Sequence, residues 1–198
     1  MDGPQGWDVR PWAGIRHARS RLARGLIRCG LVTSPEEYWQ LSLTADELLE
    51  AASCRGRAEA PHCLYSAWHD RLITSKVLPF VIGSVWSVAE YPQDSLPRRF
   101  WLEMFRVAGY TVGSRPAERP TASAVLWRGC QLGRQRRMSW TSDRIVAERF
   151  ATASIRGRQP GVVYRTDARP SALLCVNGSR NESEVVVDPR ELVIERAV

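Results

Sequence analysis

A single change in hydrophobic spacing, near residue 123, constrains the fold of this chain most strongly. Before it, apolar residues recur at helical intervals, most clearly over residues 77–88 and 96–110. After it, short runs rich in valine and threonine alternate with turn residues, a pattern typical of strands. A chain that passes once from helices to strands is expected to fold as an α+β protein. We expect a helical part over residues 34–122 packed on a β-rich core over residues 123–198, together forming one globular unit.

Cap and turn residues mark the individual elements. Ser34 and Thr44 each precede a first turn that holds carboxylates, which predicts that each hydroxyl caps a helix. Residues 111–124 hold prolines and no apolar periodicity, so they are predicted to be a loop. Beyond the loop we expect a helix over residues 143–151 and strands over residues 125–127, 138–141, 161–166, 172–176, 184–187 and 192–195.

The composition is that of an ordinary globular protein. The chain has 198 residues, 44% of them hydrophobic, which suffices for one domain with a buried core. No apolar run approaches the roughly 18 residues that read as a membrane span. The N-terminus, MDGPQGWDVRPW, lacks the basic-then-apolar pattern of a secretory leader. We expect a cytoplasmic protein without a membrane partner, and action inside a host cell is compatible with this.

The positive charge has two interpretations. The net charge is +7, and the 28 basic residues include a single lysine, Lys76. A GC-rich genome explains the arginines most simply, whereas the functional interpretation is phosphate binding by guanidinium forks. Residues 1–33 are expected to form a basic arm. Within it, residues 14–27 form either an amphipathic helix that docks on nucleic acid or an acidic surface, or a partly ordered segment with solvated charges.

The cysteines predict neither disulfides nor a metal site. Their number, 5, is odd, and no Cys-x-x-Cys pair occurs. Cys54, His62 and Cys63 lie close in sequence, but two adjacent ligands, His62 and Cys63, make a poor tetrahedral site. We therefore expect free thiols in a reducing compartment, and no metal.

Three polar segments lie beside expected strands of the β-rich part. They are Arg128-Gly129, Ser139-Trp140-Thr141 and Glu182-Ser183-Glu184. Each alone has a structural explanation: an Arg-Gly pair is common, Ser-Trp-Thr can cap the next helix, and paired glutamates often form a solvated edge. Their order, however, resembles the ADP-ribosyltransferase fold in its R-S-E class, over about residues 123–198. This resemblance implies a small split β-sheet as the core.

The resemblance implies that these segments bind NAD, as a substrate. Arg128 would hold a phosphate of the dinucleotide, and Gly129 would let the backbone approach the ligand closely. Ser139 would orient the catalytic carboxylate, and Thr141 would support the segment. Trp140 stands at the middle position of the family's Ser-Thr-Ser segment, where its ring would either stack on nicotinamide or form a wall.

Glu184 and Glu182 are the catalytic candidates. Cleavage of the nicotinamide–ribose bond develops positive charge on the ribose, and a fixed carboxylate stabilises that charge. The family's last glutamate falls on Glu184. In an extended segment the Glu182 side chain points to the same face and reaches the incoming nucleophile. Glu-x-Glu resembles the family's arrangement for arginine acceptors.

The sequence therefore predicts an NAD-dependent mono-ADP-ribosyltransferase that modifies a macromolecule, with protein arginine as the favoured acceptor. A toxin, a phage-encoded modifier of a host and an antiphage effector all fit this activity. Two alternatives stay open. One is NAD hydrolysis without an acceptor. The other is a non-enzymatic nucleic-acid- or protein-binding module that uses the basic arm, whose affinity would fall steeply with salt.

Overall fold

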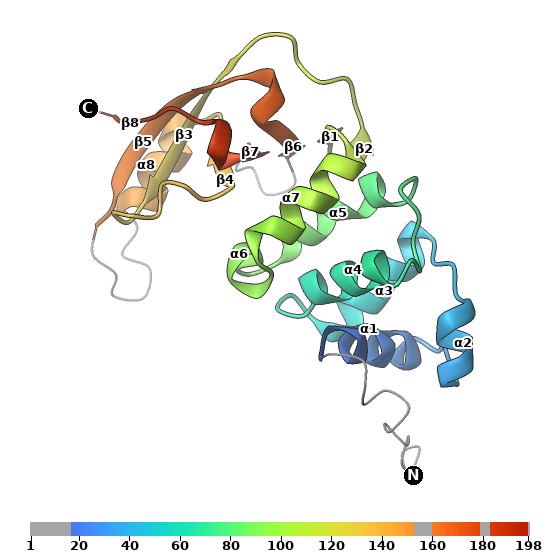
Figure 1. Ribbon diagram of the computed structural model, residues 1–198. Helices are drawn as coiled ribbons and strands as arrows, with labels where there is room; N and C mark the ends of the chain where they lie inside the picture. The colour runs from blue at the N-terminus through green and yellow to red at the C-terminus, as the bar shows by residue number, and fades with distance from the viewer. Residues whose placement is uncertain (1–16, 153–159, 179–182, 198) are drawn as a thin grey trace.

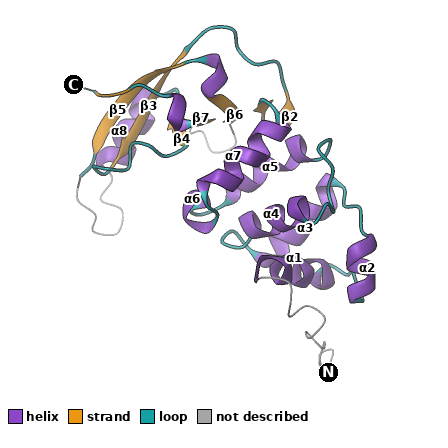
Figure 2. Ribbon diagram, in the orientation of Figure 1, coloured by secondary structure: helices purple, strands orange, loops and turns teal. Residues whose placement is uncertain are grey.

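The computed structural model describes residues 17–152, 160–178 and 183–197. Helices come first and most strands later, which gives the mixed helical and β structure expected of the chain (Figures 1 and 2). The helices of the N-terminal part are α1 (His17–Arg28), α2 (Pro35–Gln40), α3 (Ala45–Arg55), α4 (Ala60–His69), α5 (Leu78–Val88), α6 (Pro92–Ser95) and α7 (Arg98–Ala108).

Local sequence signals set where several helices begin. Ser34 and Thr44 each accept a hydrogen bond from the backbone of a glutamate three residues later, whose carboxylate bonds back to the cap. These capping boxes satisfy backbone N–H groups that a helix leaves open, and they confirm both predicted starts. No described helix has the length and apolar character that crossing a membrane requires.

The strands of the described part form one continuous sheet in the order β2-β1-β6-β7-β4-β3-β5-β8. All neighbours are antiparallel except β1 and β6. A split sheet was expected, but β7 pairs with both β6 and β4 and joins the two halves. The strands are β1 (Thr111–Val112), β2 (Arg115–Pro116), β3 (Ala124–Cys130), β4 (Ser139–Thr141), β5 (Val162–Ala168), β6 (Leu173–Asn177), β7 (Glu184–Val187) and β8 (Ile194–Arg196).

Helices cover parts of this sheet. Val186 of β7 belongs to the hydrophobic core that the helical part forms, together with Met138, Leu174 and Cys175. Val185 and Val187 face the other way and join a second cluster. Helix α8 (Arg144–Thr152) packs against β3, away from the other helices in Figure 1. Short 3-10 helices, η3 (Pro170–Ala172) and η4 (Pro189–Glu191), flank β6 and β7.

Two predictions about the N-terminal part are wrong. Helix α1 does not belong to an arm: Leu22 and Leu26 are fully buried in the helical core. A Cβ on Gly25 would lie 2.6 Å from the carbonyl oxygen of Ala51, so α1 and α3 are in close contact there. Residues 1–16 of the expected arm lie outside the described part. The expected loop over residues 111–124 also contains β1 and β2, because β1 pairs with the distant β6.

Candidate functional site

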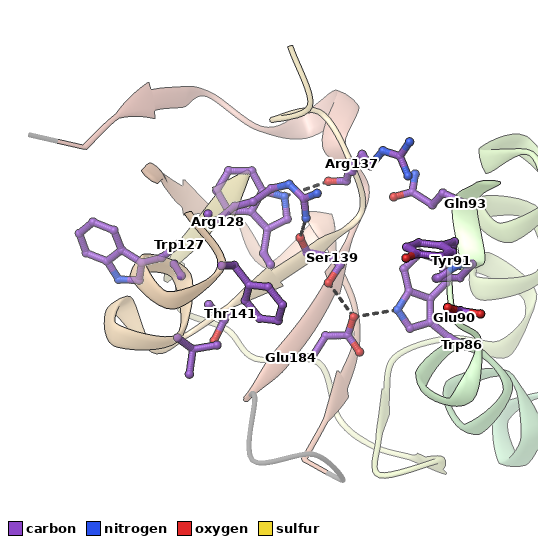
Figure 3. Close-up of a pocket in the computed structure, with 16 residues that line it drawn as sticks. Trp86, Glu90, Tyr91, Gln93, Trp127, Arg128, Arg137, Ser139, Thr141 and Glu184 are labelled. Atoms are coloured by element: carbon purple, nitrogen blue, oxygen red, sulfur yellow. Dashed lines mark hydrogen bonds between the residues drawn. The ribbon is translucent and has the colours of Figure 1, made fainter. Parts of the chain in front are cut away.

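A cleft opens between the sheet and the helical part (Figure 3). About 770 Å³ of empty space lies in it, a volume that includes the open solvent at its mouth. The sheet side carries all the described residues that the sequence singled out, and the helical side adds aromatic and polar groups. The lining residues are Trp86, Glu90, Tyr91, Pro92, Gln93, Trp127, Arg128, Gly129, Arg137, Ser139, Trp140, Thr141, Val146, Ala147, Phe150 and Glu184.

The carboxylate of Glu184 lies at the meeting point of strands β4, β6 and β7 and helix α5. Its Oε1 accepts hydrogen bonds from Ser139 Oγ at 2.7 Å and from Trp86 Nε1 at 3.0 Å (Figure 3). Asn177 Nδ2 lies 3.4 Å from Oε2, a longer bond. Since Thr141 pairs with Glu184 across the ladder, Ser139 lies two residues further along the same face. Neutral donors thus hold the carboxylate in place.

Arg128 connects the first segment to the second. Its Nη1 donates to the carbonyl oxygen of Ser139, and its Nε donates to that of Arg134 at 3.2 Å. Desolvation lowers the pKa of Arg128, with opposing contributions from Cys130 and Glu184. Arg128, Ser139 and Glu184 therefore form a hydrogen-bonded series across three adjacent strands. By donating to these two carbonyl oxygens, the Arg128 guanidinium holds the start of β4 in place. The sequence did not predict this structural role.

Gly129 allows a close approach, but the approaching backbone is that of helix α8. A Cβ at this position would lie 1.8 Å from the carbonyl oxygen of Ala147 and 2.6 Å from the nitrogen of Ala151. The expectation that Gly129 makes room for a ligand is therefore corrected: the space over its Cα is filled by α8. Its place in the lining of the cleft depends on backbone atoms, because glycine has no side chain.

Trp140 and Thr141 support the cleft from behind. The Trp140 side chain is 2% exposed, packs in the cluster with Leu126 and Val185, and donates from Nε1 to the Arg137 carbonyl. This burial favours a wall over a ring that stacks on a ligand. Thr141 is also buried, and its hydroxyl accepts a hydrogen bond from the backbone of Asp143 just before α8.

The proposed Glu182–Glu184 pair is described only at its second member. Glu182 lies outside the described residues. Ser183, which is described, has a φ of 44° and therefore adopts the left-handed conformation. The extended conformation assumed for this segment is wrong at Ser183, because side chains alternate between faces only in extended backbone. The regular strand begins at Glu184.

The helical part supplies site residues that sequence reasoning missed. Trp86 of α5, Tyr91 and Gln93 line the cleft opposite Ser139, and Gln93 Oε1 accepts a hydrogen bond from the Met138 backbone at 2.8 Å. Arg137 also lines the cleft. Its guanidinium pairs with Asp94 at 2.6 Å, which joins the start of β4 to α6. The apolar run over residues 77–88 indicates a buried helix and carries no signal that Trp86 reaches a carboxylate.

Comparison with known proteins yields no relative. No family model, no curated protein and no solved structure matches the chain. Among the described residues, no group of three or more His, Cys, Asp and Glu side chains could hold a metal ion. The geometry of the site indicates which chemistry it can support.

That geometry suits the stabilisation of positive charge. A carboxylate lines an open cleft, and within the described part of the chain one of its oxygens accepts from two donors and the other from a single donor at 3.4 Å. Such a group can accept a hydrogen bond from a sugar hydroxyl or stabilise a developing cation. Aromatic side chains on both sides of the cleft provide flat apolar surface for a heterocyclic ring.

Proposed function

We propose that this protein is an NAD-dependent mono-ADP-ribosyltransferase. The observation that supports the proposal best is the connection of Arg128, Ser139 and Glu184 within one cleft. These residues come from segments up to 56 positions apart in the chain. Their order and the strands that carry them correspond to the resemblance found in the sequence. Ser139 links the other two, because its carbonyl accepts from Arg128 and its hydroxyl donates to Glu184.

Glu184 carries the reaction in this proposal. The bond between nicotinamide nitrogen and ribose carbon breaks, and neutral nicotinamide leaves with the bonding electron pair. The Glu184 carboxylate stabilises the positive charge that develops on the ribose. A nucleophilic nitrogen of the acceptor forms the new bond to that carbon and then loses a proton. Ser139 keeps the carboxylate in place through its hydroxyl.

A guanidinium is the proposed acceptor, on a protein. Glu182 precedes the catalytic candidate by two residues, as in the family's arrangement for arginine. Water takes the place of the acceptor in the alternative activity, NAD hydrolysis. Arg128 brings positive charge to the wall of the cleft, where it attracts the pyrophosphate.

Incubation with NAD that is labelled on the adenylate half, in the presence of a cell extract, tests this function. We expect labelled protein bands and release of nicotinamide. In Glu184→Gln both signals should fall by about a hundredfold or more, because the amide keeps the shape but lacks the charge. Nicotinamide release without labelled bands would identify a hydrolase. Unchanged release in Glu184→Gln would remove Glu184 from the mechanism.

A matched control is available on the same half of the molecule. Glu148 is a half-exposed glutamate on α8 that pairs with Arg144 at 2.8 Å, outside the cleft lining. Glu148→Gln removes an equal charge and should leave NAD cleavage unchanged. If neither the wild-type protein nor this control cleaves or binds NAD, and salt-sensitive nucleic-acid binding is found instead, the binding-module alternative replaces the proposal.

A further inference from the structure

The catalytic carboxylate receives a hydrogen bond from outside the β-rich part. Trp86 is in α5, 98 residues before Glu184, and its Nε1 lies 3.0 Å from Glu184 Oε1. Figure 3 shows the indole on the helical side of the cleft and Ser139 on the sheet side, with Glu184 between them. The three segments that resemble the transferase family do not include this residue.

We infer that Trp86 is a positioning residue, which fixes the orientation of the Glu184 carboxylate and so makes the helical part an essential half of the catalytic site. The inference rests on the proposed function. The sequence resemblance places catalysis entirely on residues 123–198. The inference adds a contribution from α5, which lies outside that range.

An indole fixes a carboxylate more strictly than a hydroxyl does. The hydroxyl of Ser139 can rotate and can donate or accept, whereas the indole N–H can only donate. Oε1 of Glu184 therefore has to remain an acceptor toward Trp86 while it accepts from Ser139. Two donors from the two sides of the cleft restrict rotation of the carboxylate. Oε2 accepts the weaker hydrogen bond, from Asn177 at 3.4 Å.

Trp86 can hold the carboxylate because its own position is fixed. Its side chain is 1% exposed. The ring packs edge-on against Trp101, with centroids 4.9 Å apart, and against Phe105 at 5.8 Å. Aromatic pairs of this geometry are favourable beyond the area they bury. The aromatic cluster of α5 and α7 thus determines where the indole N–H lies, and through it where the Glu184 carboxylate lies.

Trp68 of α4 provides a control of the same chemical type. It is partly buried against the helical core, and its Nε1 also donates a hydrogen bond to a carboxylate, that of Glu103, at 3.5 Å. Trp68 is absent from the cleft lining. Trp86→Phe and Trp68→Phe therefore each remove an indole N–H that donates to a glutamate, but only the first removes a donor from Glu184.

The test compares the steady-state kinetics of NAD cleavage in both variants after circular dichroism confirms that they are folded. A hydrogen bond to a charged group corresponds to about tenfold to a hundredfold in rate. We expect kcat of Trp86→Phe to fall by that factor with KM within about twofold, whereas Trp68→Phe keeps the wild-type kcat. Equal kcat in the two variants would overturn the inference and leave the proposed function intact.

A second measurement decides the inference if the wild-type protein proves inactive on NAD, which would sink the proposed function by itself. In spectra of ¹⁵N-labelled protein, the indole N–H resonances of Trp86 and Trp68 are identified by their loss in the two Phe variants. Glu184→Gln should shift the Trp86 resonance and leave that of Trp68 in place. A Trp86 resonance insensitive to Glu184→Gln would show that the indole does not hold this side chain.

Discussion

At the scale of single residues, Gly129 sets how closely α8 approaches β3. The Cβ of an alanine would lie 1.8 Å from the carbonyl oxygen of Ala147, a distance at which the backbone has to move. Because helix backbone cannot yield as a flexible side chain can, Gly129→Ala should lower the free energy of unfolding by about 3 kcal/mol. Unfolding in urea, followed by circular dichroism, measures the change.

Gly178 is the control for this prediction. A Cβ there would meet nothing within 4 Å, and its φ lies outside the left-handed region. Gly178→Ala should change the free energy of unfolding by no more than about 0.5 kcal/mol. Similar stability of the two variants would mean that α8 does not press on β3 at Gly129.

The residue types of the candidate site were predictable from sequence, but several of their roles were not. Ser139 and Glu184 were chosen by their resemblance to a family pattern, and a hydrogen bond joins them. The partner of Arg128 was expected to be a phosphate, yet the guanidinium donates to backbone carbonyls. Sequence identifies a donor, whereas the acceptor within its reach depends on the tertiary structure.

At the scale of elements, α1 tests whether the basic N-terminal region is an arm or a part of the core. Leu26 is fully buried in the helical core. Leu26→Ala should therefore lower the free energy of unfolding by about 3 kcal/mol, through lost burial and the cavity left behind. Arg24→Ala, at an exposed position of the same helix, should change it by no more than about 0.5 kcal/mol. If both substitutions had equally small effects in thermal or urea unfolding, the interpretation of this region as an arm would be correct.

Elements with local signals were predictable, and elements that depend on distant partners were not. The capping boxes at Ser34 and Thr44 are complete within four residues, so sequence alone indicates them. Strand β7 spans the residues expected of it, 184–187. In contrast, β1 is only two residues long and exists as a strand because it pairs with β2 and β6. In α1 the apolar stripe is narrow and lies among many charged residues, so the sequence did not indicate that this helix packs in the core.

At the scale of the whole molecule, the candidate site exists because the sheet order departs from the chain order. Strand β7 lies between β6 and β4, and β4 lies beside β3, so Arg128, Ser139 and Glu184 come from three consecutive strands of the sheet. Such pairings are non-local, and periodicity within one strand does not specify them. Helix α5 then closes the cleft with Trp86. A site of this kind follows from assembly of the two parts of the chain.

Asp188 joins those two parts on the side of η4. Its carboxylate is almost fully buried and binds Arg106 of α7 at 3.0 Å and Arg190 of η4 at 2.6 Å. Burial raises the pKa of Asp188, but the hydrogen bonds and charges of Arg190 and Arg106 outweigh it and place the pKa below its usual 3.8. A depressed pKa in the folded protein means that this stabilisation is present above about pH 4 and is lost as the pH falls further.

Asp188→Asn should therefore lower the free energy of unfolding at pH 7 by about 1–2 kcal/mol, a moderate value because both arginines are half-exposed and screened by solvent. The difference from the wild-type protein should shrink when urea unfolding is repeated below pH 3.8, because the wild-type side chain takes up a proton as the pH falls through its lowered pKa. Asp94→Asn is the control, since Asp94 pairs with Arg137 at an exposed position and its loss should cost little. A difference of the same size at both pH values would mean that the shape of the side chain at position 188, and not its charge, joins the helical part to the sheet.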